Sequence, residues 1–503
     1  MLAIVNGCTV VGIEGFPVKV EVDVSRGMPG FEIVGLPDAA VKEARERVKA
    51  AIKNSGYQYP GTKITVNLAP ADIKKEGPLF DLSIAIGILA ATGQCPVPES
   101  SAMIIGELSL NGEVRAVKGM LSAAMAAAKS GYTVLYSPGQ SAWEAALIDS
   151  LQVYPVKTLR HLVNVILGDE LLEPLQPDQL LSSESQDNLD FLNIQGQEHV
   201  KRALEIAAAG GHNCLMIGPP GSGKTLLARS LPGILPQMSI EEALEVTRIH
   251  SVVDYTSLDR GLVRVRPFRS PHHSISFAGL IGGGHTPRPG EVSMAHHGVL
   301  FLDELPEFSR HTLEHLRQPL EDGHVTISRA RYSCTFPAQF MMIASMNPCP
   351  CGYYGDDEKE CTCSMGQIRK YLQKLSGPLL DRIDIHVSVP RVTYTQLTGE
   401  ATGEHSQTIR SRVEQARTTQ LKRFAEYNIY CNSSMGRPLV KQFCQMSDVA
   451  ESLLRDAFEK LKFSARAYDR ILKVSRTIAD LAHSEIINER HIAEAIQYRE
   501  GVI

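Results

Sequence analysis

The sequence lacks long apolar segments and lacks any sign of secretion. No run among its 503 residues approaches the roughly 20 uninterrupted apolar residues that a membrane helix needs. The first ten residues, MLAIVNGCTV, carry neither a basic lead nor a cleavage-like site after a long apolar run. We therefore expect a cytoplasmic protein with no membrane partner.

The chain also lacks an excess of positive charge. It has 51 Lys and Arg against 56 Asp and Glu, a net charge of -5, so a nucleic-acid partner would have to be bound by local basic surfaces. Its ten cysteines, in a long chain without a secretion signal, indicate reduced thiols or metal ligands rather than a disulfide framework. A hydrophobic content of 43% is enough for the cores of about three domains and excludes a disordered or fibrous chain.

The distribution of charge divides the chain. Between Arg160 and Lys201 there is no Lys or Arg, and acidic residues accumulate there around Pro174, Pro177 and the stretch SSESQDN. Such a segment cannot bury much apolar surface and is typical of a linker. We assign an N-terminal domain to residues 1–170, the linker to 171–190, a core domain to 191–395 and a helical domain to 396–503.

Hydrophobic periodicity predicts an α/β protein. In the N-terminal domain, residues 18–24 and 63–68 alternate as strands do, whereas 38–54 and 82–92 have helical spacing. Short apolar runs typical of buried parallel strands follow the linker, at 214–217, 299–302, 340–345 and 383–389. From about residue 405 the pattern is helical, most clearly over 448–462, 465–484 and 488–499.

The most specific motif is a complete GxxxxGK[ST] loop between an apolar strand and a helical segment. In this context the glycines let backbone N–H groups wrap around the β- and γ-phosphates of a nucleotide, while Lys224 adds a charge and Thr225 binds Mg²⁺. The alternative is a glycine-rich turn without a ligand. The loop consists of Gly218, Pro219, Pro220, Gly221, Ser222, Gly223, Lys224 and Thr225.

Hydrolysis of the nucleotide requires an acidic pair at the end of a second buried strand. The strand VLFL ends in Asp303 and Glu304, of which the first would bind Mg²⁺ and the second would act as general base on the attacking water. Asn347, at the end of FMMIASMN, would orient the same water. The alternatives are two solvated acids at a strand end and a turn-forming Asn before Pro348.

This order of motifs, followed by Leu380-Asp381-Arg382-Ile383-Asp384 and a helical C-terminal region, resembles an AAA+ ATPase. The chain is most similar to the magnesium-chelatase-like branch and, within it, to the ComM/YifB family, over nearly its whole length. The resemblance implies a Lon-protease-like α/β N-terminal domain, an AAA+ P-loop core with a parallel sheet, a helical C-terminal lid, and ATP and Mg²⁺ as cofactors.

The same resemblance assigns roles to two arginines. It implies that Arg382 is a finger that reaches the γ-phosphate of a neighbouring subunit, so that the active form is a ring, usually a hexamer; a surface salt bridge is the alternative. A permanently charged guanidinium suits that role at a subunit edge. It also implies that Arg466 is the second sensor, with Arg470 one turn later as its competitor.

Two segments of the core domain are candidates for contact with DNA. About 75 residues separate Thr225 from Val299, which indicates an insertion, and in the related branches this insertion points into the central pore. The other segment is a hairpin that we expect over 325–336, with Arg329, Arg331 and Tyr332 near its turn. Two cations and an aromatic ring suit a phosphate backbone and a stacked base. The alternative is a solvated edge hairpin protected by its arginines.

Two pairs of histidines, at 272–273 and 296–297, could suggest a metal site. Imidazoles in loops more often make ordinary hydrogen bonds, so we do not expect a metal there.

Four cysteines lie within fifteen residues, as two CxC pairs in a loop with few apolar residues. Four thiolates complete a tetrahedral zinc shell, and such a loop needs a cross-link to stay ordered. Reduced loop thiols are the alternative. The ComM-like resemblance supports a structural zinc held by Cys349, Cys351, Cys361 and Cys363.

Residues 75–135 resemble the proteolytic domain of Lon proteases, but without its catalytic pair. Where that family has its nucleophilic Ser and its Lys, this chain has Leu79 and Leu121, and Ser83 and Lys118 are out of register. Leucine can neither attack a carbonyl nor accept a proton. We therefore predict a domain without protease activity, retained for assembly or contact with DNA.

Two functions remain. The resemblance implies a hexameric, ATP-dependent DNA helicase or translocase that acts on single-stranded and branched DNA and promotes branch migration of recombination intermediates during natural transformation. The alternative is a chelatase-like AAA+ ATPase that remodels a protein partner. The N-terminal domain, the CxC pairs and the basic hairpin favour the first.

Overall fold

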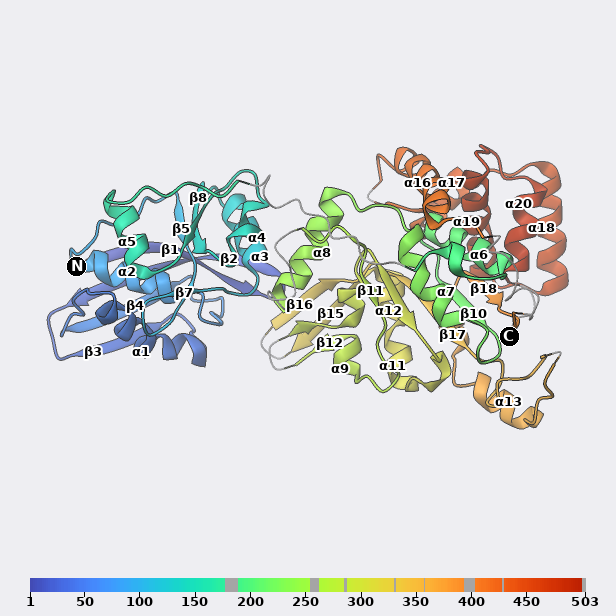
Figure 1. Cartoon of the computed structure of the whole chain (residues 1–503), viewed down its shortest axis with the longest axis horizontal. Coiled ribbons are helices and arrows are strands. Elements are labelled where there is room, and N and C mark those ends of the chain that lie inside the picture. The colour runs from blue at the N-terminus through green and yellow to red at the C-terminus, as the bar shows by residue number, and fades with distance from the viewer. Residues whose placement is uncertain are drawn as a thin grey trace. The chain divides into compact units, whose positions relative to one another are not determined.

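The chain forms two compact units in the computed structural model, which describes residues 1–176, 189–253, 262–284, 287–329, 332–356, 358–392, 403–427 and 429–499. The first unit comprises Met1–Glu184, Ile240–Val263 and Ser328–Phe336, and the second comprises Ser185–Ser239, Arg264–Ile327 and Pro337–Ile503. Figure 1 shows the elements of both.

The first unit is built on a mixed seven-stranded sheet in the order β3-β4-β2-β1-β5-β8-β9. The pairs β1/β2 and β2/β4 are antiparallel and the other pairs are parallel. Strands 18–24 and 63–68 of the sequence prediction are confirmed within β2 and β4. The seven strands are β1 (Leu2–Val11), β2 (Glu14–Ser25), β3 (Gly30–Val34), β4 (Lys63–Ala69), β5 (Ala102–Ile104), β8 (Val134–Pro138) and β9 (Gln152–Val156).

Helices pack against this sheet in two apolar clusters. One cluster joins the alternating Val18, Val20 and Val22 of β2 to α1 and α2, and the other joins β5, β8 and β9 to α3 and α4. The predicted helices 38–54 and 82–92 are confirmed, and the side chain of Asp38 caps α1 by accepting from Val41 N at 2.8 Å. The remaining elements are α1 (Ala39–Asn54), α2 (Asp81–Ala91), β6 (Glu107–Leu108), β7 (Val114–Arg115), α3 (Met120–Lys129), α4 (Ala142–Ala146) and α5 (Leu159–Leu167).

A helix that follows the phosphate loop in sequence also belongs to the first unit. In α8 (Ile240–Val253), Arg248 donates to Ile13 O at 2.9 Å and lies 2.8 Å from a carboxylate oxygen of Glu14. Ser251 accepts from Gly119 N at 3.1 Å through its carbonyl oxygen. The hairpin of β15 (His324–Arg329) and β16 (Tyr332–Pro337) contributes its residues 328–336 to this unit as well.

The second unit contains a parallel five-stranded sheet in the order β11-β14-β17-β10-β18. All four predicted parallel strands are confirmed: 214–217 and 299–302 match β10 and β14, and 340–345 and 383–389 differ from β17 and β18 by one or two residues at their ends. Three of the inner strands are buried along their whole length because helices cover both faces. The strands are β10 (Cys214–Ile217), β11 (Phe268–Arg269), β14 (Val299–Leu302), β17 (Met341–Met346) and β18 (Ile385–Ser388).

The C-terminal helices share one hydrophobic core with this sheet and with α6 (Figure 1). The predicted helical character after residue 405 is confirmed. Within the described part of the chain, no helix is both long enough and apolar enough to span a membrane. The helices of the unit are α6 (Glu198–Gly210), α7 (Lys224–Ser230), α9 (Phe277–Leu280), α10 (Glu291–Met294), α11 (Arg310–His315), α12 (Arg317–Asp322), α13 (Met365–Leu372), α14 (Gly377–Leu380), α16 (Ser406–Arg423), α17 (Arg437–Phe443), α18 (Asp448–Leu461), α19 (Ala465–Leu481) and α20 (Glu489–Gln497).

Candidate active site

The phosphate loop connects β10 to α7, so that the amino end of α7 faces the loop. Gly221 and Gly223 have φ of 77° and 89°, a conformation that costs glycine little. A Cβ on Gly218 would lie 2.1 Å from the carbonyl oxygen of Val389, so the close approach of two backbones requires glycine there. The loop therefore has the shape and the free helix terminus that phosphate binding needs.

Lys224 is the first residue of α7, and its ammonium group lies inside the loop. Nζ donates to the carbonyl oxygens of Gly218 and Pro219, both at 2.8 Å, and to Oδ1 of Asn347 at 3.3 Å. Burial lowers the pKa of Lys224 to about 8, against the opposing effect of the nearby carboxylates of Asp303 and Glu304. The predicted loop lysine and sensor asparagine thus lie together.

The predicted Mg²⁺ ligands also lie together. The Thr225 hydroxyl donates to Oδ2 of Asp303 at 2.9 Å, at the carboxyl end of β14. The hydroxyl of Ser345, in β17, donates to the other oxygen of Asp303. Sequence reasoning missed Ser345; the one signal for it is a hydroxyl at the end of an otherwise apolar strand. A hydroxyl and a carboxylate that lie this close together are a donor set that fits Mg²⁺.

Glu304 projects away from this pair toward solvent. Its backbone is left-handed, with φ of 53°, and its N–H donates to Oδ1 of Asp303 at 3.1 Å. The carboxylate is 58% exposed and lies 3.8 Å from Nδ1 of His273. An exposed carboxylate beside a metal-binding pair can accept a proton from water, which is the role predicted for Glu304. His273 belongs to a histidine pair noted in the sequence, but its position beside Glu304 was not predicted.

Arg382, the predicted finger, is enclosed within its own unit. The residue is 6% exposed, and its guanidinium donates to Pro378 O at 2.7 Å and to a carboxylate oxygen of Glu321. Glu321 lies near the end of α12 and was not identified from the sequence.

The two arginines considered for the second sensor have different surroundings. Arg470 lies 2.8 Å from Asp384, a carboxylate that is 1% exposed and lies 3.1 Å from Nδ1 of His212. Burial raises the pKa of Asp384, but Arg470 and His212 outweigh it and hold that pKa well below its usual range. Arg466 is exposed at the first turn of α19. Arg470 is therefore engaged in the core, and Arg466 is accessible.

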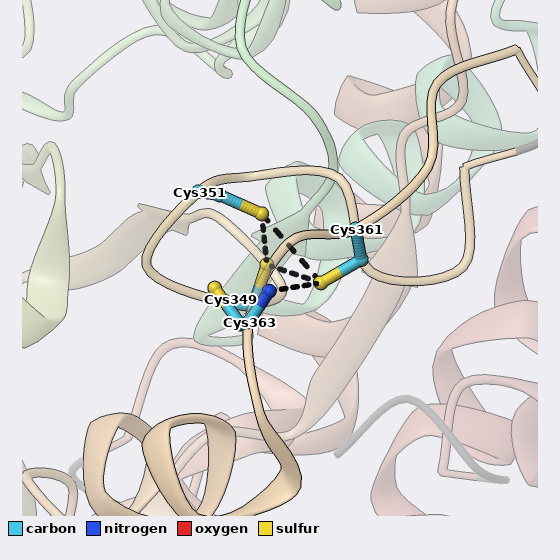
Figure 2. A group of neighbouring side chains, drawn as sticks. All are labelled: Cys349, Cys351, Cys361 and Cys363. Atoms are coloured by element: carbon cyan, nitrogen blue, oxygen red, sulfur yellow. Dashed lines mark hydrogen bonds between the residues drawn. The ribbon is translucent and has the colours of Figure 1, made fainter.

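The four cysteines of the CxC pairs converge in a loop after β17 (Figure 2). Their sulfur atoms all lie within 4.8 Å of one another, and those of Cys349, Cys351 and Cys361 are 3.3, 3.5 and 3.6 Å apart. Zinc–sulfur bonds of about 2.3 Å in a tetrahedron place sulfur atoms about 3.8 Å apart. The backbone N–H of Tyr353 lowers the pKa of Cys351 to about 5, whereas at Cys361 and Cys363 backbone N–H donors are outweighed by burial and by hydrogen bonds with neighbouring thiols, which raise the pKa. The donor set fits zinc.

This cysteine loop contacts the phosphate loop. Gly352 has φ of 88°, and a Cβ at that position would lie 2.6 Å from Cδ of Pro220 and 3.9 Å from Cγ of Asn347. Anything that orders the cysteine loop therefore also restrains two residues of the nucleotide site.

The side chains that we predict to contact DNA lie outside the residues that the structure describes. The backbone of the hairpin is as predicted, with β15 paired to β16, but Arg331 lies outside the described residues. The side chains of Arg329 and Tyr332 are likewise outside them.

The positions of the Lon catalytic pair are filled by apolar residues. Leu79 is 7% exposed and Leu121 is fully buried. Ser83 is also buried, and its hydroxyl donates to Ile104 O at 2.6 Å. Lys118 donates to Val253 O of α8 at 2.7 Å. Leu79 and Leu121 offer neither a nucleophile nor a base, and the hydroxyl of Ser83 and the amine of Lys118 are engaged with backbone carbonyls.

Comparison with known proteins places the chain among relatives of a chelatase subunit. A family model described as "Magnesium chelatase, subunit ChlI" matches residues 190–397. Models described as "Subunit ChlI of Mg-chelatase" and "Magnesium chelatase, subunit ChlI C-terminal" match residues 20–140 and 403–499.

Two full-length relatives share 45% identity with the chain. One is uncharacterized protein YifB of Escherichia coli (strain K12), aligned over 99% of this chain and 97% of the relative, and the other is competence protein ComM of Haemophilus influenzae, aligned over 100% and 98%. Lon protease 2 of Bacillus subtilis is 29% identical over 202 residues, which are 37% of this chain and 33% of that protein.

Proposed function

Because the chain belongs to the ComM/YifB family of magnesium-chelatase-like AAA+ proteins, we propose that it is an ATP-dependent hexameric DNA helicase or translocase that promotes branch migration. The observation that carries the ATPase part is the convergence of Thr225 with Asp303 and of Lys224 with Asn347. A full-length relative is named competence protein ComM, and this name supports a role with DNA in natural transformation.

ATP with Mg²⁺ supplies the reactive phosphoanhydride, and the residues of the site fit it. The N–H groups of the loop and Lys224 would bind the phosphates, and Thr225 with Asp303 would hold the metal. Glu304 accepts a proton from the attacking water, which Asn347 helps to orient. Arg382 of a neighbouring subunit, with Arg466, stabilises the charge that develops on the transferred phosphoryl group.

DNA would be bound by the hairpin, and zinc would order the cysteine loop. Arg329 and Arg331 provide charge for phosphates near the turn, and Tyr332 provides a ring for a base. A structural zinc in the four-cysteine site would restrain the loop that contacts Pro220.

A test of this function measures the ATPase rate with and without a four-way DNA junction, together with strand exchange on that junction. Stimulation of ATP turnover by the junction and ATP-dependent strand exchange would support the motor. Glu304→Gln serves as a control that should bind the junction without exchanging strands.

The second candidate is a chelatase-like remodelling ATPase that acts on a protein partner. The match of three chelatase-subunit models along the chain favours it. ATP turnover that no DNA stimulates, with no strand exchange, would favour this candidate over the motor.

A further inference from the structure

Arg382 is too enclosed, as it stands, to reach another subunit. Its side chain is 8% exposed, and two hydrogen bonds fix the guanidinium to Pro378 O and to Glu321. Its Nε has no hydrogen-bond partner among the described residues, so one donor remains unused in this conformation. A finger that acts on a neighbour's phosphate has to exchange at least one of these contacts.

Glu321 is the contact that can be exchanged. Its side chain is 58% exposed, whereas the carbonyl of Pro378 belongs to the backbone four residues before Arg382. A carboxylate and a phosphate present the same pair of oxygens to a guanidinium fork, so one can replace the other.

The charge around Glu321 points to the same exchange. The hydrogen bond from Arg382, together with the charges of Arg466 and Arg470, holds the pKa of Glu321 below its usual range. The predicted finger, Arg382, and the predicted second sensor, Arg466, thus both act on one carboxylate of their own chain.

The position of Glu321 also connects it to the hairpin. Glu321 is the penultimate residue of α12, and Gly323 in a left-handed conformation separates that helix from β15. Only Asp322 and Gly323 therefore separate Glu321 from the first residue of the hairpin, His324.

We infer that Glu321 is a positioning residue for the arginine finger: it holds Arg382 on its own subunit and releases it to the phosphate of a neighbouring subunit's nucleotide. The hairpin, when it binds DNA, favours this release. This inference rests on the proposed function, because it assumes that Arg382 acts in trans.

The test compares Glu321→Gln with the wild-type chain in ATP turnover without DNA. The amide keeps the shape of the side chain but loses the charge that retains Arg382. We expect kcat without DNA to rise about two- to fivefold, the effect of removing one partly exposed ion pair, with KM for ATP unchanged. The stimulation by a DNA junction should fall by the same factor, and Glu321→Asp should restore wild-type behaviour.

Two controls separate this role from a structural one. Glu451→Gln removes the charge of a glutamate of similar exposure, which pairs with Arg455 at 3.1 Å, and should leave turnover unchanged. In the double variant Glu321→Gln/Arg382→Ala the gain should disappear, because Glu321 acts through Arg382. A rate in Glu321→Gln that equals or falls below the wild-type rate would overturn the inference.

A measurement without turnover keeps the inference separate from the proposed function. A Glu304→Gln background prevents turnover, so that assembly of the ring can be measured by sedimentation at increasing ATP concentration. There, Glu321→Gln should lower the ATP concentration at the midpoint of assembly by about two- to fivefold. An unchanged midpoint would overturn the inference even if the wild-type chain showed no response to DNA. Absence of that response in the wild-type chain would contradict the DNA motor alone.

Discussion

Nη1 of Arg470 lies 2.8 Å from Oδ1 of Asp384, and this ion pair distinguishes two arginines that the sequence left in competition. Asp384 is buried beside His212, whose Nε2 lies 2.8 Å from the hydroxyl of Thr477. The pair therefore belongs to a polar network that joins the strand region of the core to α19. Arg466, one turn earlier, is exposed to solvent.

Arg470→Ala should consequently reduce the stability of the fold, whereas Arg466→Ala should reduce ATP turnover. Loss of Arg470 leaves a buried carboxylate poorly compensated and should destabilise the fold by about 3 kcal/mol. Loss of exposed Arg466 should change stability by less than about 0.5 kcal/mol but reduce ATP turnover. Thermal unfolding and steady-state turnover of both variants decide this, and the reverse pattern would reassign the second sensor to Arg470.

Arg382→Ala should bind nucleotide normally and fail to hydrolyse it. The guanidinium is assigned to charge that develops in the transition state on a neighbouring subunit, so its loss affects turnover rather than binding. Fluorescent-nucleotide titration and ATPase rates measure the two effects. Full turnover in this variant would refute the assignment in trans, and Arg455→Ala, which removes an arginine from an ion pair at the surface, is its control.

The double variant Arg329→Ala/Arg331→Ala should bind DNA more weakly and with a shallower dependence on salt. Each lost phosphate contact removes about 0.9 from the slope of log K against log salt, so the slope should change by roughly 2 on duplex DNA. Titrations at several salt concentrations measure it. The exposed pair Lys42→Ala/Arg45→Ala on α1 is a charge-matched control, and equal effects in both variants would place the DNA contact elsewhere.

The purified chain should contain one zinc per molecule. Cys361→Ser should lose the metal and also weaken nucleotide binding, because the cysteine loop packs on Pro220 through Gly352. Elemental analysis and nucleotide titration test the two effects. Cys431 lies outside the cluster, so Cys431→Ser should keep both the metal and the nucleotide affinity. If the purified wild-type chain contains no metal, the zinc prediction is wrong and the four cysteines are reduced thiols.

Nucleotide affinity should fall as the pH rises above about 8. Burial lowers the pKa of Lys224 to about 8 in the free site, and phosphate favours the charged amine, so binding becomes linked to proton uptake above that pH. The dissociation constant should then increase by up to about tenfold per pH unit, and remain level below pH 8. Lys224→Arg keeps its charge and should show no such rise in titrations between about pH 7 and 9.5.

The sequence predicted the elements and most of the site because both depend on local patterns. A buried strand followed by Gly218–Thr225 specifies a strand, a loop and a helix within a dozen residues, and the acidic strand end at Asp303 follows the same logic. The spacing of the four cysteines likewise predicted a cluster, because a short loop keeps its side chains within reach of one another.

Contacts between distant segments could not be predicted in this way. Ser345 binds Asp303 from another strand, and Glu321 meets Arg382 across 61 residues of chain. No short motif encodes such pairs, since each side chain alone is an ordinary serine or an ordinary surface acid. The grouping of α8 with the first unit has the same origin, because its partners Glu14 and Glu144 precede it by more than 100 residues.

The packing of α8 limits how freely this architecture can be divided. The helix lies between the phosphate loop and Val299 in sequence, yet it covers the position of Leu121, where Ser251 bonds to Glu144 and Glu144 accepts from Leu121 N. A fragment that starts after the linker would expose this surface of α8 and lose its partner. A segment from the middle of the chain thus completes the packing of its N-terminal part, so a cut at the linker would not separate two self-sufficient modules.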